Sequence, residues 1–300
     1  MAQELEIKLS LEPGDLPRAL DWLRARPEAA QGSRKSLVNR YYDTPGAELN
    51  HQKAALRVRQ SGDQYIQTFK TRGEFVNGAH RREEWEWPLC GPSLSLELLA
   101  DTPLGNGINL ARLAPVFETN FTRQIVMLDD GEALIECAVD SGVIIVGDHQ
   151  KPLHEVEFEL KSGDSSRLLV WADRLARHCP VFLNLISKAE QGYFLAGVRM
   201  PAPAIIENAG DQISKHGDMH RLLHRLSHAW LEHGAVSLEG IDLLLLRRQA
   251  KACGLEQAFS DLAEYLAKGG ALGACSVNQN WVSASLACWC APKATARAPE

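Results

Sequence analysis

Long hydrophobic runs are missing from this sequence of 300 residues. The longest apolar candidate, 241–246, contains Asp242 and falls far short of the roughly 18 residues that a membrane-spanning helix needs. The first residues, Met-Ala-Gln-Glu-Leu-Glu-Ile-Lys, contain no apolar segment of the kind that directs secretion. We therefore expect a cytoplasmic protein without a membrane partner.

Paired cysteines and an excess of basic charge are also missing. The seven cysteines are an odd number and mostly scattered; only Cys288 and Cys290 lie close together, and Cys-x-Cys alone is a weak zinc signal. The 32 Lys and Arg residues are outnumbered by 38 Asp and Glu residues, which gives a formal charge of −6. Nucleic-acid binding through bulk charge is thus not expected, and any bound anion must meet a local basic cluster.

The hydrophobic content of 45% is, in contrast, ample for a folded core. Polar and apolar residues alternate strictly in four segments, which predicts strands at 4–9, 55–59, 84–87 and 155–160. Helical patterns interrupt the strands at 15–26 and 166–177. The first two thirds of the chain therefore combine strands with a few helices.

The C-terminal third has a different pattern. Pro201 and Pro203 are typical of a linker, so we predict a first domain over 1–200 and a helical, histidine-rich extension over 201–300. Helical periodicity runs from about residue 214 to 268, and four histidines recur there along one stripe: His216, His220, His224 and His228. Three interpretations stay open, namely a polar helix face, an anion-binding face and a chelating metal site. The last residues, 292–300, are expected to be disordered.

Charged residues on the predicted strands are sorted onto one face. Glu4, Glu6 and Lys8 share a face of the first strand, and Arg57 and Arg59 share a face of a later strand. The opposite faces carry branched and aromatic residues that are suited to packing under helices. If those faces point outward, the charged faces must surround a lumen, which a closed antiparallel barrel of about eight strands provides. We therefore predict an α+β fold, a closed eight-stranded antiparallel β-barrel with covering helices, followed by a short helical C-terminal region.

Such a lumen needs a ligand. Burial of many charges is unfavourable unless they pair with one another or meet a ligand or metal. Carboxylates and basic side chains that converge in one lumen therefore indicate a polyanion, with the basic groups on its oxygens and the carboxylates on a bridging divalent cation.

Several motifs, taken in order along the chain, resemble the CYTH domain of the triphosphate tunnel metalloenzymes. They are Glu4-x-Glu6-x-Lys8, Leu56-Arg57-Val58-Arg59, Lys70, Arg123, Asp140, Glu155-x-Glu157-x-Glu159 and Ser187-Lys188, together with the turn Tyr41-Tyr42-Asp43-Thr44-Pro45. The resemblance covers about residues 1–197. It implies an antiparallel eight-stranded tunnel that binds a triphosphate together with Mg²⁺ or Mn²⁺.

Each charged group in such a tunnel has an expected role. Arg57 and Arg59 project together and can each bind two phosphate oxygens. The expected substrate-binding residues are Lys8, Arg57, Arg59, Lys70, Arg82, Arg123 and Lys188, and all of these except Arg82 are also expected to be catalytic. The expected metal-binding residues are Glu4, Glu6, Asp140, Glu155, Glu157 and Glu159. Three arginines are explained equally well as surface residues (Arg40, Arg72 and Arg82), and two carboxylates as partners of arginines or ligands of a second metal (Glu84 and Glu86).

The expected reaction is hydrolysis of inorganic triphosphate to pyrophosphate and phosphate by a metal-activated water, with no covalent enzyme intermediate. Inorganic triphosphate (tripolyphosphate) is favoured because no residue set visibly provides a pocket for an organic group. The two-part layout also resembles bacterial inorganic triphosphatases that carry a CHAD helical domain, although the extension here is shorter than that domain. The alternatives are a class IV-type adenylate cyclase, a thiamine or nucleoside triphosphatase, and a non-catalytic polyphosphate-binding module. The oligomeric state is left open.

Overall fold

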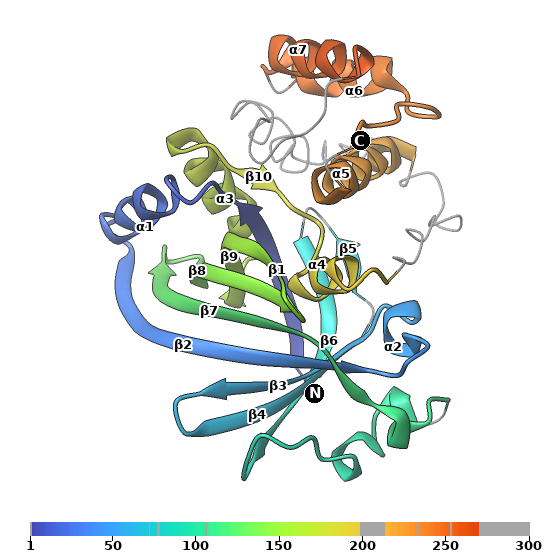
Figure 1. Ribbon diagram of the computed structural model, residues 1–300. Coiled ribbons are helices and arrows are strands. Elements are labelled where there is room, and N and C mark those ends of the chain that lie inside the picture. The colour runs from blue at the N-terminus through green and yellow to red at the C-terminus, as the bar shows by residue number, and fades with distance from the viewer. Residues whose placement is uncertain are drawn as a thin grey trace, which may run out of the picture.

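The computed structural model describes residues 2–71, 73–76, 79–105, 107–198, 214–232, 234–252 and 254–269 (Figure 1). The strands within these ranges are β1 (Ala2–Ser10), β2 (Ala29–Asp43), β3 (Ala55–Ser61), β4 (Gln64–Lys70), β5 (Glu74–Val76), β6 (Ala79–Leu89), β7 (Ala114–Asp129), β8 (Ala133–Val146), β9 (His149–Gly163) and β10 (Phe182–Leu183). The helices are α1 (Leu16–Arg24), α2 (Glu48–His51), α3 (Ser166–His178), α4 (Lys188–Leu195), α5 (Ser214–Glu232), α6 (Leu243–Ala252) and α7 (Glu256–Ala267). Within the described residues, no helix is both long enough and apolar enough to cross a membrane.

Eight of the described strands close into a barrel. Their order is β1-β9-β8-β7-β2-β3-β4-β6, every neighbouring pair is antiparallel, and β6 pairs with β1 to complete the ring. β5 adds to β6, and the short β10 adds to β1. The predicted closed eight-stranded antiparallel barrel is therefore confirmed. Because side chains alternate along a strand, every second residue of the wall points into the lumen.

The main hydrophobic core lies outside the barrel wall. Ile7 and Leu9 of β1 and Phe158 of β9 are buried together with the apolar residues of α1 and α3, which lie side by side on one flank of the barrel (Figure 1). Trp171 of α3 is completely buried, and its indole N–H donates to Asp130 Oδ2 over 2.8 Å. Burial of apolar area is the chief favourable term in folding, at about 25 cal/mol per Å². The main core thus packs on the outer face of the wall, while charged groups line most of the cavity inside.

A second hydrophobic cluster covers β3, β4 and β6 from outside. Leu56 and Phe69 are buried there, and the ring of Phe69 lies 5.4 Å from that of the partly buried Trp85. Leu99 and Leu104, from short 3₁₀ turns at Glu97–Leu99 and Pro103–Gly105, complete the cluster. The apolar faces of these strands point outward, as their alternation predicts.

Helices cover the barrel where the sequence predicts them. The patterns at 15–26 and 166–177 correspond to α1 and α3, and the helical region at 214–268 consists of α5, α6 and α7. α5 packs on the segment around β10: the rings of Phe182 and Trp230 stack at 5.7 Å, and the Leu185 N–H donates to Ser227 Oγ over 3.1 Å. The first helix of the extension is therefore joined to the barrel by both apolar and polar contacts.

Several expectations fall outside the described residues. These are the linker at Pro201 and Pro203, the side chains of Arg72 and His216, the pair Cys288 and Cys290, and the end of the chain. The division into domains at residue 200 accordingly stays a prediction.

Candidate active site

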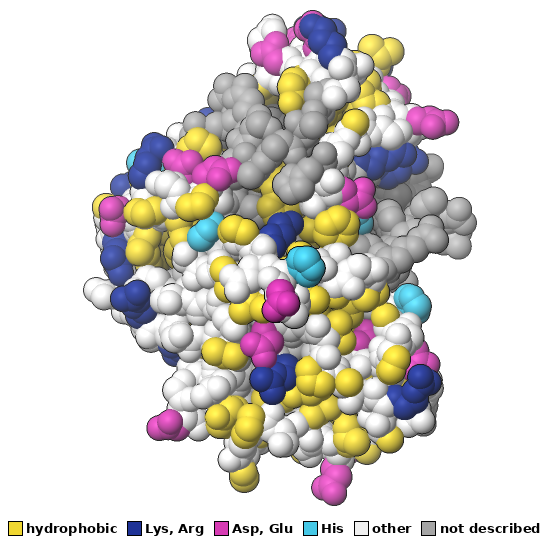
Figure 2. Space-filling model, viewed as in Figure 1, with side chains coloured by type: hydrophobic (Ala, Val, Ile, Leu, Met, Phe, Trp, Pro, Cys, Tyr) yellow, Lys and Arg dark blue, Asp and Glu magenta, His cyan; other side chains and the backbone are white. Residues whose placement is uncertain are grey.

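The barrel lumen contains a cavity of about 330 Å³ whose lining is mainly charged. Eleven of the thirteen predicted site residues line it: Glu4, Glu6, Lys8, Arg57, Arg59, Lys70, Arg82, Arg123, Glu157, Glu159 and Lys188. The other two, Asp140 and Glu155, are buried in the adjoining wall, where both bind Lys188. On the face of the molecule shown in Figure 2, in contrast, acidic and basic side chains are scattered among hydrophobic and neutral ones. The charges that the alternation sorts onto one face thus gather inside the barrel.

The first strand supplies a row of charges that pair across the barrel closure. The strand register places Glu4 opposite Arg82, whose Nε lies 2.7 Å from Glu4 Oε2 and whose Nη2 lies 2.6 Å from Glu6 Oε1. Lys70 Nζ lies 2.9 Å from both Glu4 carboxylate oxygens, and Lys8 Nζ lies 3.0 Å from Glu6 Oε1. Burial alone would raise the pKa of Glu4, but Lys70 and Arg82 lower it well below its ordinary value. Glu4 therefore presents anionic oxygens to the lumen at neutral pH.

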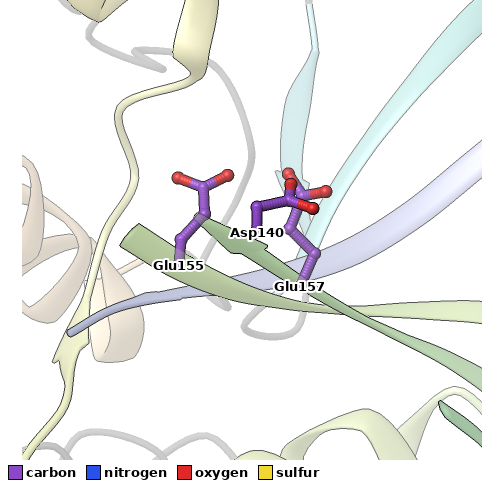
Figure 3. Close-up of side chains that lie close together, drawn as sticks. All are labelled: Asp140, Glu155 and Glu157. Carbon is purple, nitrogen blue, oxygen red and sulfur yellow. The ribbon is translucent and has the colours of Figure 1, made fainter. Parts of the chain in front are cut away.

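The strands that follow β1 around the barrel, β9, β8 and β7, carry a denser cluster, which we call the paired wall: Arg123, Asp140, Glu155, Glu157 and Lys188. Arg123 binds Asp140 through two hydrogen bonds of 2.8 and 2.7 Å and also reaches Glu157 Oε2 at 2.5 Å. Lys188 Nζ lies 2.9 Å from Asp140 and from Glu157 and contacts Glu155 as well. Figure 3 shows the three carboxylates converging from β8 and β9. The neighbouring strands and the start of α4 thus bring two cations and three carboxylates into one buried cluster.

The protonation states in the paired wall differ. Burial raises the pKa of Glu155 to about 8, even though Lys188 opposes the change, and Glu155 Oε2 has no hydrogen-bond partner among the described residues. Burial would also raise the pKa of Glu157, but Lys188, Arg123 and Lys8 lower it well below the ordinary value. Burial and the neighbouring charges of Glu157 and Asp140 therefore make Glu155 the carboxylate of this cluster that is expected to hold a proton.

The lining fits a divalent cation, as judged by its donors and its charge. Oxygens of Asp140, Glu155 and Glu157 lie within 4.8 Å of one another, yet the Lys188 ammonium already contacts all three. Glu4, Glu6 and Glu159 offer further carboxylate oxygens on the neighbouring strands β1 and β9. Nine Lys or Arg and eight Glu side chains line the cavity, a formal balance near +1, so a strongly charged anion would need additional cations to be neutralised.

Arg57 and Arg59 on β3 form what we call the arginine wall, and neither has a carboxylate at hydrogen-bonding distance among the described residues. Within the described residues Arg59 forms no ion pair, and its Nε donates to Asn39 Oδ1 over 2.7 Å. The nearest carboxylate to Arg57 is Glu84 at 3.9 Å, and Arg57 Nε has no hydrogen-bond partner in the described part of the chain. Burial, together with the charges of Arg57 and Arg123, lowers the pKa of Arg59 to about 9. Guanidinium groups in such surroundings are suited to an anionic ligand.

The turn Tyr41-Tyr42-Asp43-Thr44-Pro45 has a structural role beside the cavity. Asp43 is buried, and its carboxylate accepts four hydrogen bonds of 2.7–3.0 Å, from the backbone N–H groups of Thr44, Leu49 and Asn50 and from the hydroxyl of Tyr193. Asp43 therefore joins α2 to α4. A capping box between Ser187 and Glu190 fixes the start of α4, which projects Lys188 into the lumen.

Some lining residues are absent from the set predicted from the sequence. Glu136 and Lys161 line the cavity and continue the alternation that contains Asp140 and Glu159, so period-two spacing could have found them. Lys53, in the turn before β3, and His224, on α5, also line the cavity. Neither lies on a strand of the barrel, and no spacing in the sequence connects them to it.

Arg82 and Arg40, which the sequence could place either in the lumen or on the surface, occupy different positions. Arg82 belongs to the lumen, as described above, whereas Arg40 is exposed and pairs with Glu118 at 2.8 Å on the outside. Glu84 and Glu86 both line the cavity; Glu84 lies 3.1 Å from Lys70, and Glu86 accepts a hydrogen bond of 3.1 Å from Thr68.

The structure thus combines a closed antiparallel barrel with a cavity lined by carboxylates and basic groups. Comparison with protein families matches residues 2–193 to the CYTH domain. The chain therefore belongs to the CYTH domain family, as its motifs predict.

Two known proteins illustrate the relationship. The chain is 34% identical over 200 residues to the inorganic triphosphatase of Haemophilus influenzae, an alignment that covers 65% of this chain but only 55% of that protein. A similar solved structure is that of HpAC1 from Hippeastrum, a proposed adenylyl cyclase with a dominant triphosphatase activity. It has a TM-score of 0.51 and 18% identity, over 66% of this chain and 98% of that one. At this identity the second likeness concerns the fold alone.

Proposed function

We propose that the lumen binds inorganic triphosphate with a divalent cation and hydrolyses its terminal phosphoanhydride bond. The arginine wall carries this proposal. Arg57 and Arg59 place two guanidinium groups in the cavity, of which Arg57 has only a distant carboxylate partner and Arg59 has none among the described residues, and planar guanidinium forks are well suited to phosphate oxygens. The name of the Haemophilus relative supports the same substrate class.

The carboxylates of the lumen would hold the cation. Glu4, Glu6, Glu157 and Glu159 are the proposed ligands for Mg²⁺ or Mn²⁺, which would supply positive charge to phosphate oxygens and make a bound water more acidic. A purely anion-binding module would not need these carboxylates, and their presence weighs against a non-catalytic role.

The residues of the chain position the anion and neutralise its charge. Arg57 and Arg59 bind the phosphate oxygens on one side, while Lys8, Lys70 and Arg82 add positive charge from the β1 side. In the reaction a water oxygen bonds to the terminal phosphorus, the bridging P–O bond breaks, its electron pair leaves on pyrophosphate, and the water proton is released. Phosphoryl transfer through a loose transition state depends mainly on such positioning and charge stabilisation. No covalent enzyme intermediate is required.

The inorganic substrate is favoured over a nucleotide by the character of the lining. Among the described lining residues the aromatic ones are Tyr41, Tyr193 and His224, and the imidazole of His224 stacks on that of His228 at 4.9 Å. Tyr193 donates its hydroxyl hydrogen to Asp43, and the ring of Tyr41 stacks on Phe117 at 4.5 Å. These rings already contact protein groups, and the rest of the described lining is mainly charged, which suits an inorganic anion better than a base.

A substrate panel tests the proposal. Phosphate release is measured from tripolyphosphate, ATP and thiamine triphosphate with Mg²⁺ or Mn²⁺, and the ATP reaction is also examined for cyclic AMP. We expect tripolyphosphate to be hydrolysed fastest, and Glu4→Gln and Lys8→Ala to lower turnover by orders of magnitude. Glu118→Gln, on the outer surface, serves as the control. Cyclic AMP as the main product would show that the reaction is a cyclisation and not the proposed hydrolysis. Full activity of both lumen variants would contradict the proposed site.

A further inference from the structure

One end of the tunnel is bordered by elements that lie far apart in the sequence. Lys53 from the turn after α2, Ser187 and Lys188 from the start of α4, and His224 from α5 line the same cavity as the arginine wall. α5 lies close to α4 and β10 in Figure 1 and is outside the CYTH match, which ends at residue 193. A helix beyond the family match thus contributes a side chain to the cavity.

Lys53 is held rigidly at this end of the tunnel. Its backbone has a φ of 55°, in the left-handed region that costs a residue with a Cβ roughly 1–2 kcal/mol. The turn is fixed by hydrogen bonds of 2.9 Å from Lys53 N to Asn50 O and from Ala54 N to Leu49 O. The four hydrogen bonds to Asp43 anchor the preceding helix. An unfavourable conformation that the surroundings enforce next to a cavity is a common feature of functional sites.

His224 is fixed by the packing of α5. Leu223 and Leu226 are buried in the main hydrophobic core, and Ser227 accepts the hydrogen bond from Leu185 N. The imidazole stacks on that of His228 at 4.9 Å, and its Nδ1 is buried without a hydrogen-bond partner among the described residues. Burial and the charges of His228, His220 and Lys53 lower the pKa of His224 to about 3. The ring is therefore neutral at ordinary pH and can donate one N–H.

We propose that Lys53 and His224 bind the outermost phosphate group of a triphosphate held by the arginine wall, so that α5 forms part of the substrate-binding site. This inference rests on the proposed function. The ammonium group of Lys53 can donate a strong, charge-assisted hydrogen bond to a phosphate oxygen. The neutral imidazole of His224 can donate a second hydrogen bond beside it. Both groups position the substrate and take no part in bond breaking.

Binding measurements with two ligand lengths test the inference. Isothermal titration in EDTA compares tripolyphosphate with pyrophosphate, which is one phosphate group shorter and on this proposal leaves Lys53 and His224, the outer pair, without a ligand when it binds the arginine wall. For Lys53→Ala and His224→Ala we expect an affinity for tripolyphosphate about 10-fold lower, whereas that for pyrophosphate changes less than about 2-fold. With the divalent cation present, KM for tripolyphosphate should rise by about the same factor while kcat stays within about 3-fold of wild type.

Matched controls separate this effect from a general loss of charge or stability. Lys35→Ala and His149→Ala remove the same side chains at exposed positions that do not line the cavity. The inference would be overturned if Lys53→Ala and His224→Ala bound tripolyphosphate as tightly as the wild type, or if they lost the same affinity for both ligands. If His224→Ala does not fold, Lys53→Ala decides the question alone. A wild-type protein that neither binds nor hydrolyses tripolyphosphate would instead disprove the proposed function.

Discussion

The two sides of the lumen use charge in different ways. In the paired wall, Arg123 and Lys188 each contact two or more buried carboxylates at hydrogen-bonding distance. In the arginine wall, Arg59 forms no ion pair with a described residue and Arg57 only a distant one. Removal of one partner from a paired, buried cluster leaves an uncompensated charge, whereas removal of an uncompensated charge relieves an existing penalty. The paired wall should therefore contribute to stability, and the arginine wall to ligand binding at some cost in stability.

Substitution of the central cation in the paired wall should have the largest effect on stability. Lys188→Met leaves Asp140, Glu155 and Glu157 with Arg123 as their remaining close cation, so the free energy of unfolding should fall by about 3–5 kcal/mol. Denaturant unfolding in EDTA, with the exposed Lys35→Met as control, measures the change. A variant as stable as the wild type would show that the ion pairs do not hold this wall together.

Substitution in the arginine wall should lower activity but not stability. Arg59→Met removes a partly buried guanidinium that has no carboxylate partner among the described residues, and the relieved charge penalty offsets the lost hydrogen bond to Asn39, so the melting temperature should stay about the same. The value of kcat/KM for tripolyphosphate should fall about 100-fold, because charge-assisted hydrogen bonds contribute about 1.5–3 kcal/mol each. Scanning calorimetry and phosphate release on the same preparation test both parts. A large fall in melting temperature would place Arg59 among the stabilising charges instead.

The pH dependence of stability should distinguish Glu155 from its neighbours. Its pKa in the folded protein is about 8, above the ordinary value of 4.5, so the stability that its proton contributes is complete below pH 4.5 and is lost as the pH rises to about 8. The amide side chain in Glu155→Gln does not titrate, so this variant lacks the pH-dependent contribution. In EDTA, wild type should lose about 1–3 kcal/mol relative to the variant between pH 5 and 8. Parallel pH profiles for the two proteins would mean that Glu155 is ionised throughout.

The smallest effect is expected outside the barrel. Arg40 is next to Asn39 in the chain but faces solvent, and its side chain is 47% exposed beside Glu118. Arg40→Gln should change the free energy of unfolding by less than about 0.5 kcal/mol and leave phosphate release unchanged. If Arg40→Gln lost as much activity as Arg59→Met, the proposed difference in function between lumen and surface arginines would be wrong.

Alternation in the sequence predicts the barrel and most of the charged lumen because several strands have one charged and one apolar face. Glu4, Glu6 and Lys8 oppose Leu5, Ile7 and Leu9, so their direction follows from the burial of the apolar set. The same logic applies to Arg57 and Arg59, which oppose Leu56 and Val58.

Alternation does not predict which face points into the lumen on strands that carry polar and apolar residues on both faces. On β2, Arg40 and Tyr42 share one face, while Asn39 and Tyr41 share the other. Neither face is clearly apolar, and the structure shows that Tyr41 lines the cavity and Arg40 does not. Tertiary packing, through the stacking of Tyr41 on Phe117, decides between them.

The position of the outer pair could not be predicted for a different reason, although an anion-binding face was one interpretation of the histidine stripe that contains His224. Lys53 follows a four-residue helix whose position depends on Asp43, and His224 reaches the cavity because α5 packs against β10. Both placements depend on contacts between segments distant in sequence, which no local pattern encodes.

Binding of tripolyphosphate without turnover tests the central claim most directly. Isothermal titration in EDTA should give salt-sensitive binding to the wild-type protein. The double variant Arg57→Met/Arg59→Met should lose this binding by at least about 100-fold while keeping the wild-type melting temperature. A folded double variant that binds tripolyphosphate as tightly as the wild type would contradict the account, because the anion would then not be held by the arginines of the lumen.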